Sequence, residues 1–232
     1  MKNSQDSVVE AVHAAILRDG LLEPGQRVIV AASGGADSTA LLHVLAELGY
    51  RVEAAYFDHR TRGGESARDA LFVRDTAAAL GIPFHTDGAD VDGDARSAGR
   101  SFEDQARHAR YAFLRRVAGE TGCGVAAVAH HLDDQAETVL LHLLRGTAGR
   151  GLAGMAPFRT EDGMRIVRPL LGCTRAELRA WLRGRGISWR EDATNADPHH
   201  ALRNRVRHEL LPALSRGYNP AISRGLARLA HA

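Results

Sequence analysis

The sequence predicts an α/β protein built on a doubly wound parallel sheet. Apolar strand candidates and helix candidates alternate along the first two thirds of the 232 residues. This alternation is typical of a parallel sheet covered by helices on both faces. The clearest strand candidates are continuous apolar runs, as expected for strands that are buried on both sides.

The elements follow one another in a regular order. An amphipathic surface helix is expected first, within residues 1–20. Strands are then expected at 27–33, 52–57, 82–88 and 124–130, and helices at 39–48, 67–80, 102–120 and 133–146. A polar, glycine-rich stretch at 88–100 indicates a loop.

After residue 146 the pattern changes. A glycine-rich loop leads to a candidate edge strand ending at Pro169. Helices are expected at 174–186, with Thr174 and Glu177 in capping-box spacing, and at 203–214. We expect one catalytic domain over residues 1–214 and the start of a linker helix over 215–232.

Composition excludes several classes of protein. Hydrophobic residues make up 44% and charged residues 25% of the chain, which excludes disordered and collagen-like proteins. The two cysteines, Cys123 and Cys173, exclude a disulfide scaffold and fit a reducing cytosol. There is no apolar run of the roughly 20 residues that a membrane span needs, and no apolar signal block. We therefore expect a cytoplasmic protein that does not enter a membrane.

Charge is distributed unevenly. Residues 1–144 contain 14 Lys and Arg against 21 Asp and Glu, whereas residues 145–232 contain 16 against 7. A basic second half suggests a polyanionic partner. An ordinary arginine-rich surface is the alternative.

The strongest functional signal is the segment Ser33-Gly34-Gly35-Ala36-Asp37-Ser38, between a predicted strand and a predicted helix. Glycines let the backbone approach an anion closely, and a helix N-terminus offers free N–H groups. Asp37 would suit a Mg²⁺ ion bridged to that anion. The segment therefore predicts a phosphate site; a turn capped by Asp37 or Ser38 is the alternative.

Two other nucleotide-binding patterns are excluded. A Walker A loop needs a lysine that is absent here. Gly149, Gly151 and Gly154 match G-x-G-x-x-G, but they follow a helix instead of a strand, so the context of a dinucleotide fold is missing.

A second polar cluster extends from His130 to Thr138, at the end of a predicted strand. Asp134 and Glu137 are three residues apart and share a helix face. Such a pair suits an ammonium group or Mg²⁺. The alternatives are a helix cap with Asp134 as N-cap, and a zinc site, for which further ligands are lacking.

Ser33–Ser38 resembles the signature of the PP-loop ATP pyrophosphatase superfamily, which has the adenine nucleotide alpha hydrolase-like fold. The stretch HHLDDQAETVLLHLLRGTAGRGLAGM is similar to the hallmark of the tRNA(Ile)-lysidine synthetase family. Further agreement, in the same order across about residues 26–214, comes from DHRTRGGESARD, ARHARYAFL, IVRPLL with TRAELRAWL, and EDATNADPHHALRNRVRHELLPAL.

The resemblance implies ligation of free L-lysine to C2 of the wobble cytidine of the isoleucine tRNA with a CAU anticodon. ATP would first adenylate the C2 oxygen, so that AMP and pyrophosphate are released. ATP and Mg²⁺ are therefore the expected cofactors. Family members often pair as homodimers, although the sequence shows no dimer face.

The resemblance also implies roles for single residues. The ATP phosphates would be held by Ser33, Gly34, Gly35, Asp37 and Ser38, with Asp37 also on the metal. Adenosine would be bordered by Phe57, Asp58 and His59. Lysine would be held by Asp134, Glu137 and Arg110, and the reacting groups would be served by Asp37, Arg110, His130, Asp134 and Glu137. Phosphates of the tRNA would be held by Arg145, Arg168, Arg203, Asn204, Arg205 and Arg207. The loop Gly146–Gly154 would close over the anticodon nucleotide.

Three alternatives and one departure accompany this resemblance. Family members usually continue into C-terminal tRNA-binding domains, which we expect to be absent from this chain. A tRNA thiolase of the same superfamily would need paired cysteines, and a glutamine-dependent amide synthetase would need an amidotransferase partner. A non-catalytic module that binds tRNA and ATP is the third alternative.

Overall fold

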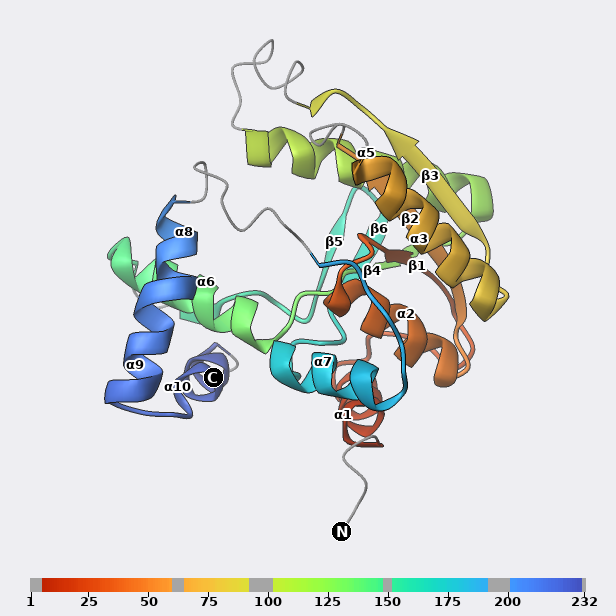
Figure 1. Cartoon of the computed structure of the whole chain (residues 1–232). Coiled ribbons are helices and arrows are strands. Elements are labelled where there is room, and N and C mark those ends of the chain that lie inside the picture. The colour runs from red at the N-terminus through yellow and green to blue at the C-terminus, as the bar shows by residue number, and fades with distance from the viewer. Residues whose placement is uncertain (1–5, 60–64, 92–101, 148–151, 192–200, 231–232) are drawn as a thin grey trace.

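A computed structural model describes residues 6–59, 65–91, 102–147, 152–191 and 201–230 (Figure 1). Most of the loop predicted at 88–100, and the middle of the loop predicted to close over the nucleotide, lie outside these ranges. Within the described ranges, no helix is both long enough and apolar enough to cross a membrane.

The core of the molecule is a six-stranded sheet with the strand order β3-β2-β1-β4-β6-β5. The strands are β1 (Arg27–Ala31), β2 (Arg51–Asp58), β3 (Phe84–Gly88), β4 (Val125–Ala127), β5 (Phe158–Glu161) and β6 (Met164–Val167). All neighbouring pairs are parallel except β5 with β6. The strand order reverses between β1 and β4, so the carboxyl ends of these strands mark the switch point where such sheets bind ligands.

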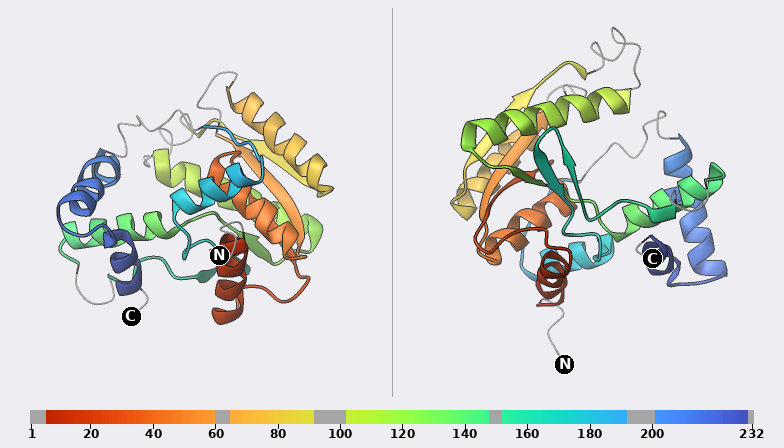
Figure 2. Two further views of the ribbon diagram at one scale, coloured as in Figure 1. Left: turned by 60° about the horizontal axis from the view of Figure 1, so that its bottom comes forward. Right: turned by 180° about the vertical axis from the view of Figure 1, so that it is seen from behind.

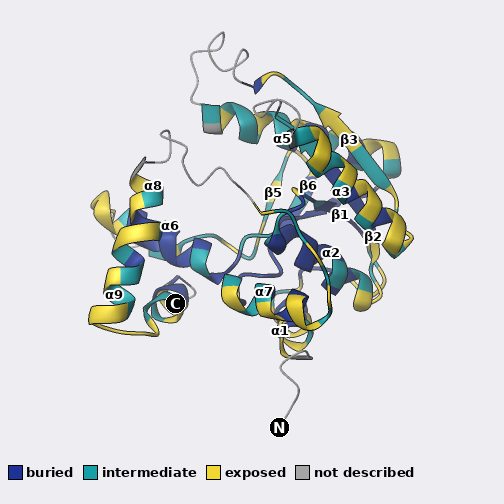
Figure 3. Ribbon diagram, in the orientation of Figure 1, coloured by how far each residue is buried: buried dark blue, intermediate teal, exposed yellow. Residues whose placement is uncertain are grey.

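Helices cover both faces of the sheet, as predicted. One face carries α1 (Asp6–Arg18), α2 (Ala36–Glu47), α3 (Glu65–Leu80) and α7 (Arg175–Gly184). The other face carries α5 (Phe102–Thr121), whose Leu114 and Val117 pack on Ile29 and Ala126. The view from behind in Figure 2 shows α5 lying across this second face. Buried residues concentrate in the strands β1, β2, β4 and β6 and in the inner sides of these helices (Figure 3).

A separate helical cluster extends from the sheet. Its elements are α6 (Leu132–Leu144), α8 (Ala201–Arg205), the π-helical turn η3 (Val206–Leu210), α9 (Leu211–Gly217) and α10 (Ile222–Leu229). Val139 and Leu140 of α6 pack with Val206, Leu211 and Leu226. Residues beyond 214 therefore share a core with α6, and the domain boundary at residue 214 stays a prediction.

The prediction of an edge strand before Pro169 was wrong. The strand exists as β6, but it lies between β4 and β5. The strand at this edge of the sheet is β5. It pairs antiparallel with β6 through the two-residue turn Asp162-Gly163. Both turn residues have positive φ, 48° and 79°, the conformation that suits a tight hairpin.

Candidate active site

A cavity of about 480 Å³ opens at the switch point of the sheet. Its walls come from the carboxyl ends of β1, β2 and β4, from α5 and α7, and from η3. Among the residues predicted to be functional, the lining contains Ser33, Gly35, Asp37, Ser38, Phe57, His59, Arg110, His130 and Arg207. The structure therefore brings together residues that are up to 174 positions apart in the sequence.

The loop Ser33–Ser38 has the geometry of an anion cradle. Gly34 has φ +83°, a conformation that favours glycine. The N-cap of α2 is Gly35, which has no side chain that could cap the helix. The alternative with Asp37 or Ser38 as N-cap was therefore wrong. Ser38 Oγ instead accepts from the backbone N–H of Ser33 (3.1 Å) and donates to the Gly35 carbonyl (3.2 Å), which holds the loop closed. The first-turn N–H groups of α2 are left for a ligand.

Asp37 fits a metal ligand at the entrance of this loop. Its Oδ1 is buried without a hydrogen-bond partner among the described residues, and Oδ2 lies 3.4 Å from His131 Nε2 and 3.7 Å from Arg175 Nε. A buried carboxylate oxygen without a partner is costly unless a cation meets it. Mg²⁺ prefers such oxygen ligands. No cluster of three metal-binding side chains occurs within the described ranges, so Mg²⁺ would need further oxygen ligands from phosphates and water.

His131 lies between the loop and the acidic pair. It is fully buried and is the N-cap of α6: its Nδ1 accepts from the Asp134 N–H, and its own N–H donates to Asp134 Oδ2. The capping box thus begins at His131. The alternative had placed its N-cap three residues later, at Asp134. Burial disfavours the imidazolium, but the charges of Asp134 and Asp37 outweigh it and raise the pKa of His131.

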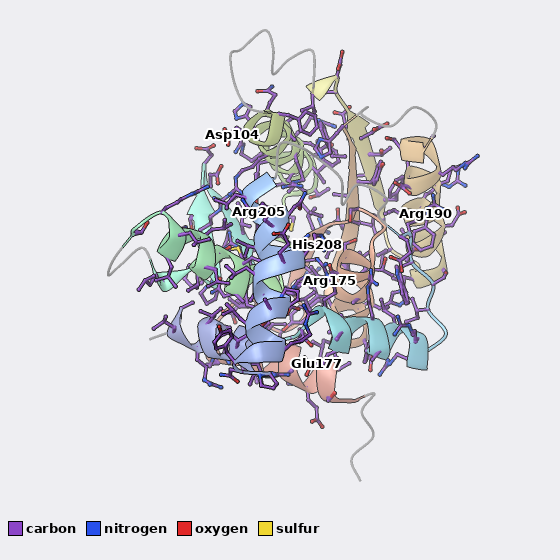
Figure 4. The ribbon with its side chains drawn as sticks, turned by 60° about the vertical axis from the view of Figure 1, so that its left-hand side comes forward. Asp104, Arg175, Glu177, Arg190, Arg205 and His208 are labelled. Carbon is purple, nitrogen blue, oxygen red and sulfur yellow. The ribbon has the colours of Figure 1, made fainter. Side chains whose placement is uncertain are left out.

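Glu137 lies at the centre of a buried ion-pair network. Its side chain is 2% exposed, and its oxygens Oε1 and Oε2 are 2.6 and 2.8 Å from Nε and Nη2 of Arg207. Nη2 of Arg207 also lies 3.2 Å from Asp134 Oδ1, and Arg203 Nε lies 3.2 Å from Glu137 Oε2. The arginines predicted to bind tRNA therefore contact the acidic pair predicted to bind lysine. Figure 4 looks onto the helix that carries them, with Arg205 and His208 labelled.

The chain matches a known protein family and several known proteins. The model of the PP-loop domain family matches residues 5–214. The chain belongs to the PP-loop family. It is 45% identical to a tRNA(Ile)-lysidine synthase of Symbiobacterium thermophilum over 96% of this chain and 47% of that protein. It is 47% identical to a protein of the same name from Thermus thermophilus over 97% of this chain and 42% of that protein.

The chain thus spans about half the length of the curated relatives it matches. Among solved structures, a U34-tRNA thiolase of Methanococcus maripaludis, NcsA, with its [4Fe-4S] cluster, superposes with a TM-score of 0.75. The match covers 98% of this chain and 80% of that one at 20% identity, which supports the PP-loop fold alone.

Arg110 and His130, both predicted to serve the reacting groups, line the cavity. Burial lowers the pKa of His130 to about 4; Asp134 opposes this effect, while Arg168, Arg110 and Arg203 add to it. His130 is therefore neutral near pH 7. Its Nδ1 is buried and has no hydrogen-bond partner among the described residues.

Two of the three residues predicted to border adenosine lie at the cavity. Phe57 and His59 line the cavity, with ring centroids 5.1 Å apart in an edge arrangement. Asp58 ends β2 between them and does not line the cavity.

The remaining residues predicted to contact tRNA occupy different environments. Arg145, at the end of α6, and Arg205 are exposed, whereas Asn204 is partly buried. Arg205 Nε lies 3.6 Å from Glu209 Oε2. Arg168 is only 6% exposed and donates through Nη1 to the Ala156 carbonyl, so a phosphate would reach it only if the residues above it moved. Its role in binding tRNA stays a prediction.

Sequence reasoning missed three residues of the site. His131, within the second polar cluster, was given no role. Arg175 approaches Asp37, and Arg190 holds the cavity wall through its N–H to Gly34 O (2.9 Å) and its Nε to Asp69 Oδ1 (2.8 Å). The doubled histidine was a usable signal, but nothing in the local sequence distinguishes Arg175 or Arg190 from other surface arginines.

Proposed function

We propose that this chain carries the catalytic domain of a tRNA(Ile)-lysidine synthase. In this proposal ATP adenylates the C2 oxygen of the wobble cytidine in the CAU isoleucine tRNA, and the ε-amine of free L-lysine then displaces AMP. The observation that carries the proposal is one cavity that joins the Ser33–Ser38 loop to His130, Arg110 and, through Arg207, the buried pair Asp134 and Glu137. Similarity to lysidine synthases over nearly the whole chain supports it.

The first step would take place at the loop. The C2 oxygen of cytosine forms a bond to the α-phosphorus of ATP, and the bond from that phosphorus to the bridging oxygen breaks, so that pyrophosphate leaves. The N–H groups at the start of α2 would hold the phosphate oxygens. Arg110, on the cavity wall, would stabilise the negative charge of the leaving group. Mg²⁺, held by Asp37, would supply electrostatic screening of the phosphates.

The second step requires a neutral amine. The lysine nitrogen forms a bond to C2, the bond from C2 to the adenylate oxygen breaks, and the amine gives up its excess proton to a base. The carboxylates of Asp134 and Glu137 would attract the ammonium form and orient its chain. His130, with its pKa near 4, would orient the nucleotide as a hydrogen-bond acceptor and would not store a proton.

The thiolase alternative has less support. Cys123 and Cys173 are both free and buried, and they lie in the cores on opposite faces of the sheet. Burial, together with the charge of Glu177, raises the pKa of Cys173 to about 12, so it is not a thiolate at neutral pH. A sulfur carrier needs an accessible thiolate.

Lysidine formation would take place on cytoplasmic tRNA, so a cytoplasmic location belongs to the proposal. A homodimer also belongs to the proposal, because members of the tRNA(Ile)-lysidine synthetase family often pair as homodimers.

Lysine incorporation tests the proposal directly. The chain is mixed with labelled L-lysine, Mg·ATP and an isoleucine tRNA transcript with a CAU anticodon; a transcript with U at the wobble position is the control. We expect label in the first tRNA only, with one AMP released per lysine. Release of AMP without label would show that the lysine assignment is wrong, and tRNA binding without AMP release would favour a non-catalytic module. Measurements at high tRNA and low salt separate weak binding from an inactive site.

A further inference from the structure

The acidic pair predicted to bind lysine has no free oxygen in this structure. Arg207 contacts both oxygens of Glu137 and Oδ1 of Asp134, while Oδ2 of Asp134 accepts from the His131 N–H at 3.1 Å. Arg203 adds a second guanidinium on Glu137 Oε2. Two carboxylates are therefore matched by two guanidiniums, and an incoming ammonium group would meet no unpaired charge here.

The position of Arg207 separates this pair from the cavity. Arg207 lines the cavity, whereas Asp134 and Glu137 are not among the described residues that line it. Glu137 is 2% exposed, but the side chain of Arg207 is 23% exposed. Among the described residues, Arg207 is thus the one that both lines the cavity and contacts Glu137.

We propose that the guanidinium of Arg207 occupies the binding site of the lysine ammonium group until a polyanion binds Arg207 and displaces it from Glu137. We call Arg207 in this role a displaceable plug. The inference rests on the proposed function and adds a binding order: RNA first, then lysine. Exchange of one cation for another keeps the buried carboxylates paired, whereas a bare Glu137 would be strongly unfavourable. Displacement therefore requires both a new partner for Arg207 and a new cation for Glu137.

The segment that carries Arg207 is suited to bind a polyanion. Arg203 and Arg207 are four residues apart and share the face that points to Glu137, while Arg205 faces outward and is 69% exposed at its side chain. Phosphate oxygens accept the same bidentate hydrogen bonds from arginine as a carboxylate does. Arg207 also lies in the π-helical turn Val206–Leu210, and such turns are frequent at functional sites.

Lysine affinity measured with and without RNA tests the proposal. The probe is an anticodon stem-loop RNA with a CAU anticodon, and labelled L-lysine is measured by equilibrium dialysis at low salt without ATP. We expect the wild-type chain to bind lysine at least about 10-fold more tightly with the RNA, within the usual range of coupling between two sites. Equal affinity with and without RNA would overturn the proposal. Lysine incorporation in the same preparation reports on the proposed function separately.

The variant Arg207→Ala distinguishes a plug from a structural support. As a plug, Arg207 competes with lysine, so the variant binds lysine at least about 10-fold more tightly than wild type without RNA. Millimolar guanidinium ion should then fill the vacated place and weaken lysine binding again. If Arg207 merely supports the fold, the variant loses lysine binding and guanidinium restores it, which would overturn the proposal.

Two further measurements keep the proposal testable if Arg207→Ala does not fold. Arg203→Ala removes one 3.2 Å contact and leaves the bidentate pair, so we expect a smaller gain in lysine affinity in the same direction. In the wild-type chain, the Nε–H signal of Arg207 in a ¹⁵N spectrum should be protected from exchange. RNA and lysine together should remove this protection; a signal that stays protected in the ternary mixture would contradict displacement.

Discussion

Arg207 and Glu137 form a bidentate ion pair, with Nε 2.6 Å from Oε1 and Nη2 2.8 Å from Oε2, across 70 residues of sequence. The pair joins α6, whose N-terminus adjoins the Ser33–Ser38 loop, to the π-helical turn that carries Arg207. Because Glu137 is almost fully buried, the pair cannot be broken without a substitute cation. This relationship links the sites proposed for ATP, lysine and RNA.

Replacement of Glu137 by Gln should chiefly impair the use of lysine. The amide keeps the shape of the side chain but removes the negative charge that attracts an ammonium group. We expect the KM for lysine to rise at least about 10-fold, equivalent to about 1.4 kcal/mol, while the KM for ATP stays within about 2-fold. Steady-state lysine incorporation measures both. The matched control is Glu209→Gln, because Glu209 is 67% exposed and forms an ion pair with the exposed Arg205. An unchanged lysine KM in Glu137→Gln would refute the assignment.

Replacement of Asp37 by Asn should abolish adenylation without unfolding the protein. The amide has nearly the same volume, but it cannot supply a charged ligand to Mg²⁺. We expect pyrophosphate release to fall at least about 100-fold, the usual effect of losing one electrostatic group at a reacting phosphate. Asp75→Asn is the control, since Asp75 is 67% exposed and contacts Arg74. Pyrophosphate release near the wild-type rate in Asp37→Asn would remove Asp37 from the metal site.

Local sequence predicted the site better than it predicted the contacts within it. The Ser33–Ser38 loop and the turn after β4 follow short-range rules: glycines, an apolar strand and a helix start. The pairing of Arg207 with Glu137 depends on how α8 and η3 pack on α6 through Val206 and Leu211, which no local pattern encodes. The turn Asp162-Gly163 was a local hairpin signal, but the polar strand Phe158–Glu161 before it concealed β5.

Gly154 should tolerate alanine much less well than Gly163. Both have positive φ, 58° and 79°, so both substitutions strain the backbone. A Cβ at Gly154 would also lie 2.8 Å from Gln135 Oε1 and 2.9 Å from Ala230 Cβ, whereas Gly163 has nothing within 4 Å. Gln135 is fully buried and exchanges two hydrogen bonds with Met155, so it cannot easily move.

We therefore expect Gly154→Ala to lower the free energy of unfolding by about 1–3 kcal/mol more than Gly163→Ala, as typical for overpacking. Urea denaturation of both variants measures the difference. Equal losses would mean that the loop after residue 151 is free to shift, and that Gly154 is needed for its backbone conformation alone.

Replacement of Arg205 by Ala should weaken RNA binding without changing the affinity for lysine at saturating RNA. Its side chain is 69% exposed and faces away from Glu137. Loss of one phosphate contact should reduce the slope of log K against log salt by about 0.7–0.9. Fluorescence anisotropy of a labelled stem-loop RNA across a salt series measures the slope, and a tRNA of unrelated sequence should show the same reduction. An unchanged slope would place the phosphates elsewhere on the basic half of the chain.

His130 and His131 should give opposite pH dependences of stability in separate windows. The pKa of His130 falls to about 4 in the folded protein, against about 6.5 in the unfolded chain. Between these values the unfolded chain binds more protons, so acidification from pH 6.5 to pH 4 destabilises the fold by up to about 3 kcal/mol. His130→Asn should remove this loss, and its unfolding free energy should fall less over that window.

The raised pKa of His131 has the contrary consequence. The folded protein holds the proton more tightly, so this contribution to stability is complete below pH 6.5 and is lost as the pH rises through the folded pKa. In His131→Asn the amide oxygen can still cap α6, but the side chain does not titrate, so the variant should flatten the decline above pH 6.5. Urea denaturation at half-unit steps from pH 4 to pH 9 separates the two histidines. If His130→Asn followed the wild-type curve below pH 6.5, His130 would be protonated in the folded protein, and its role as a neutral group that orients the nucleotide would fail.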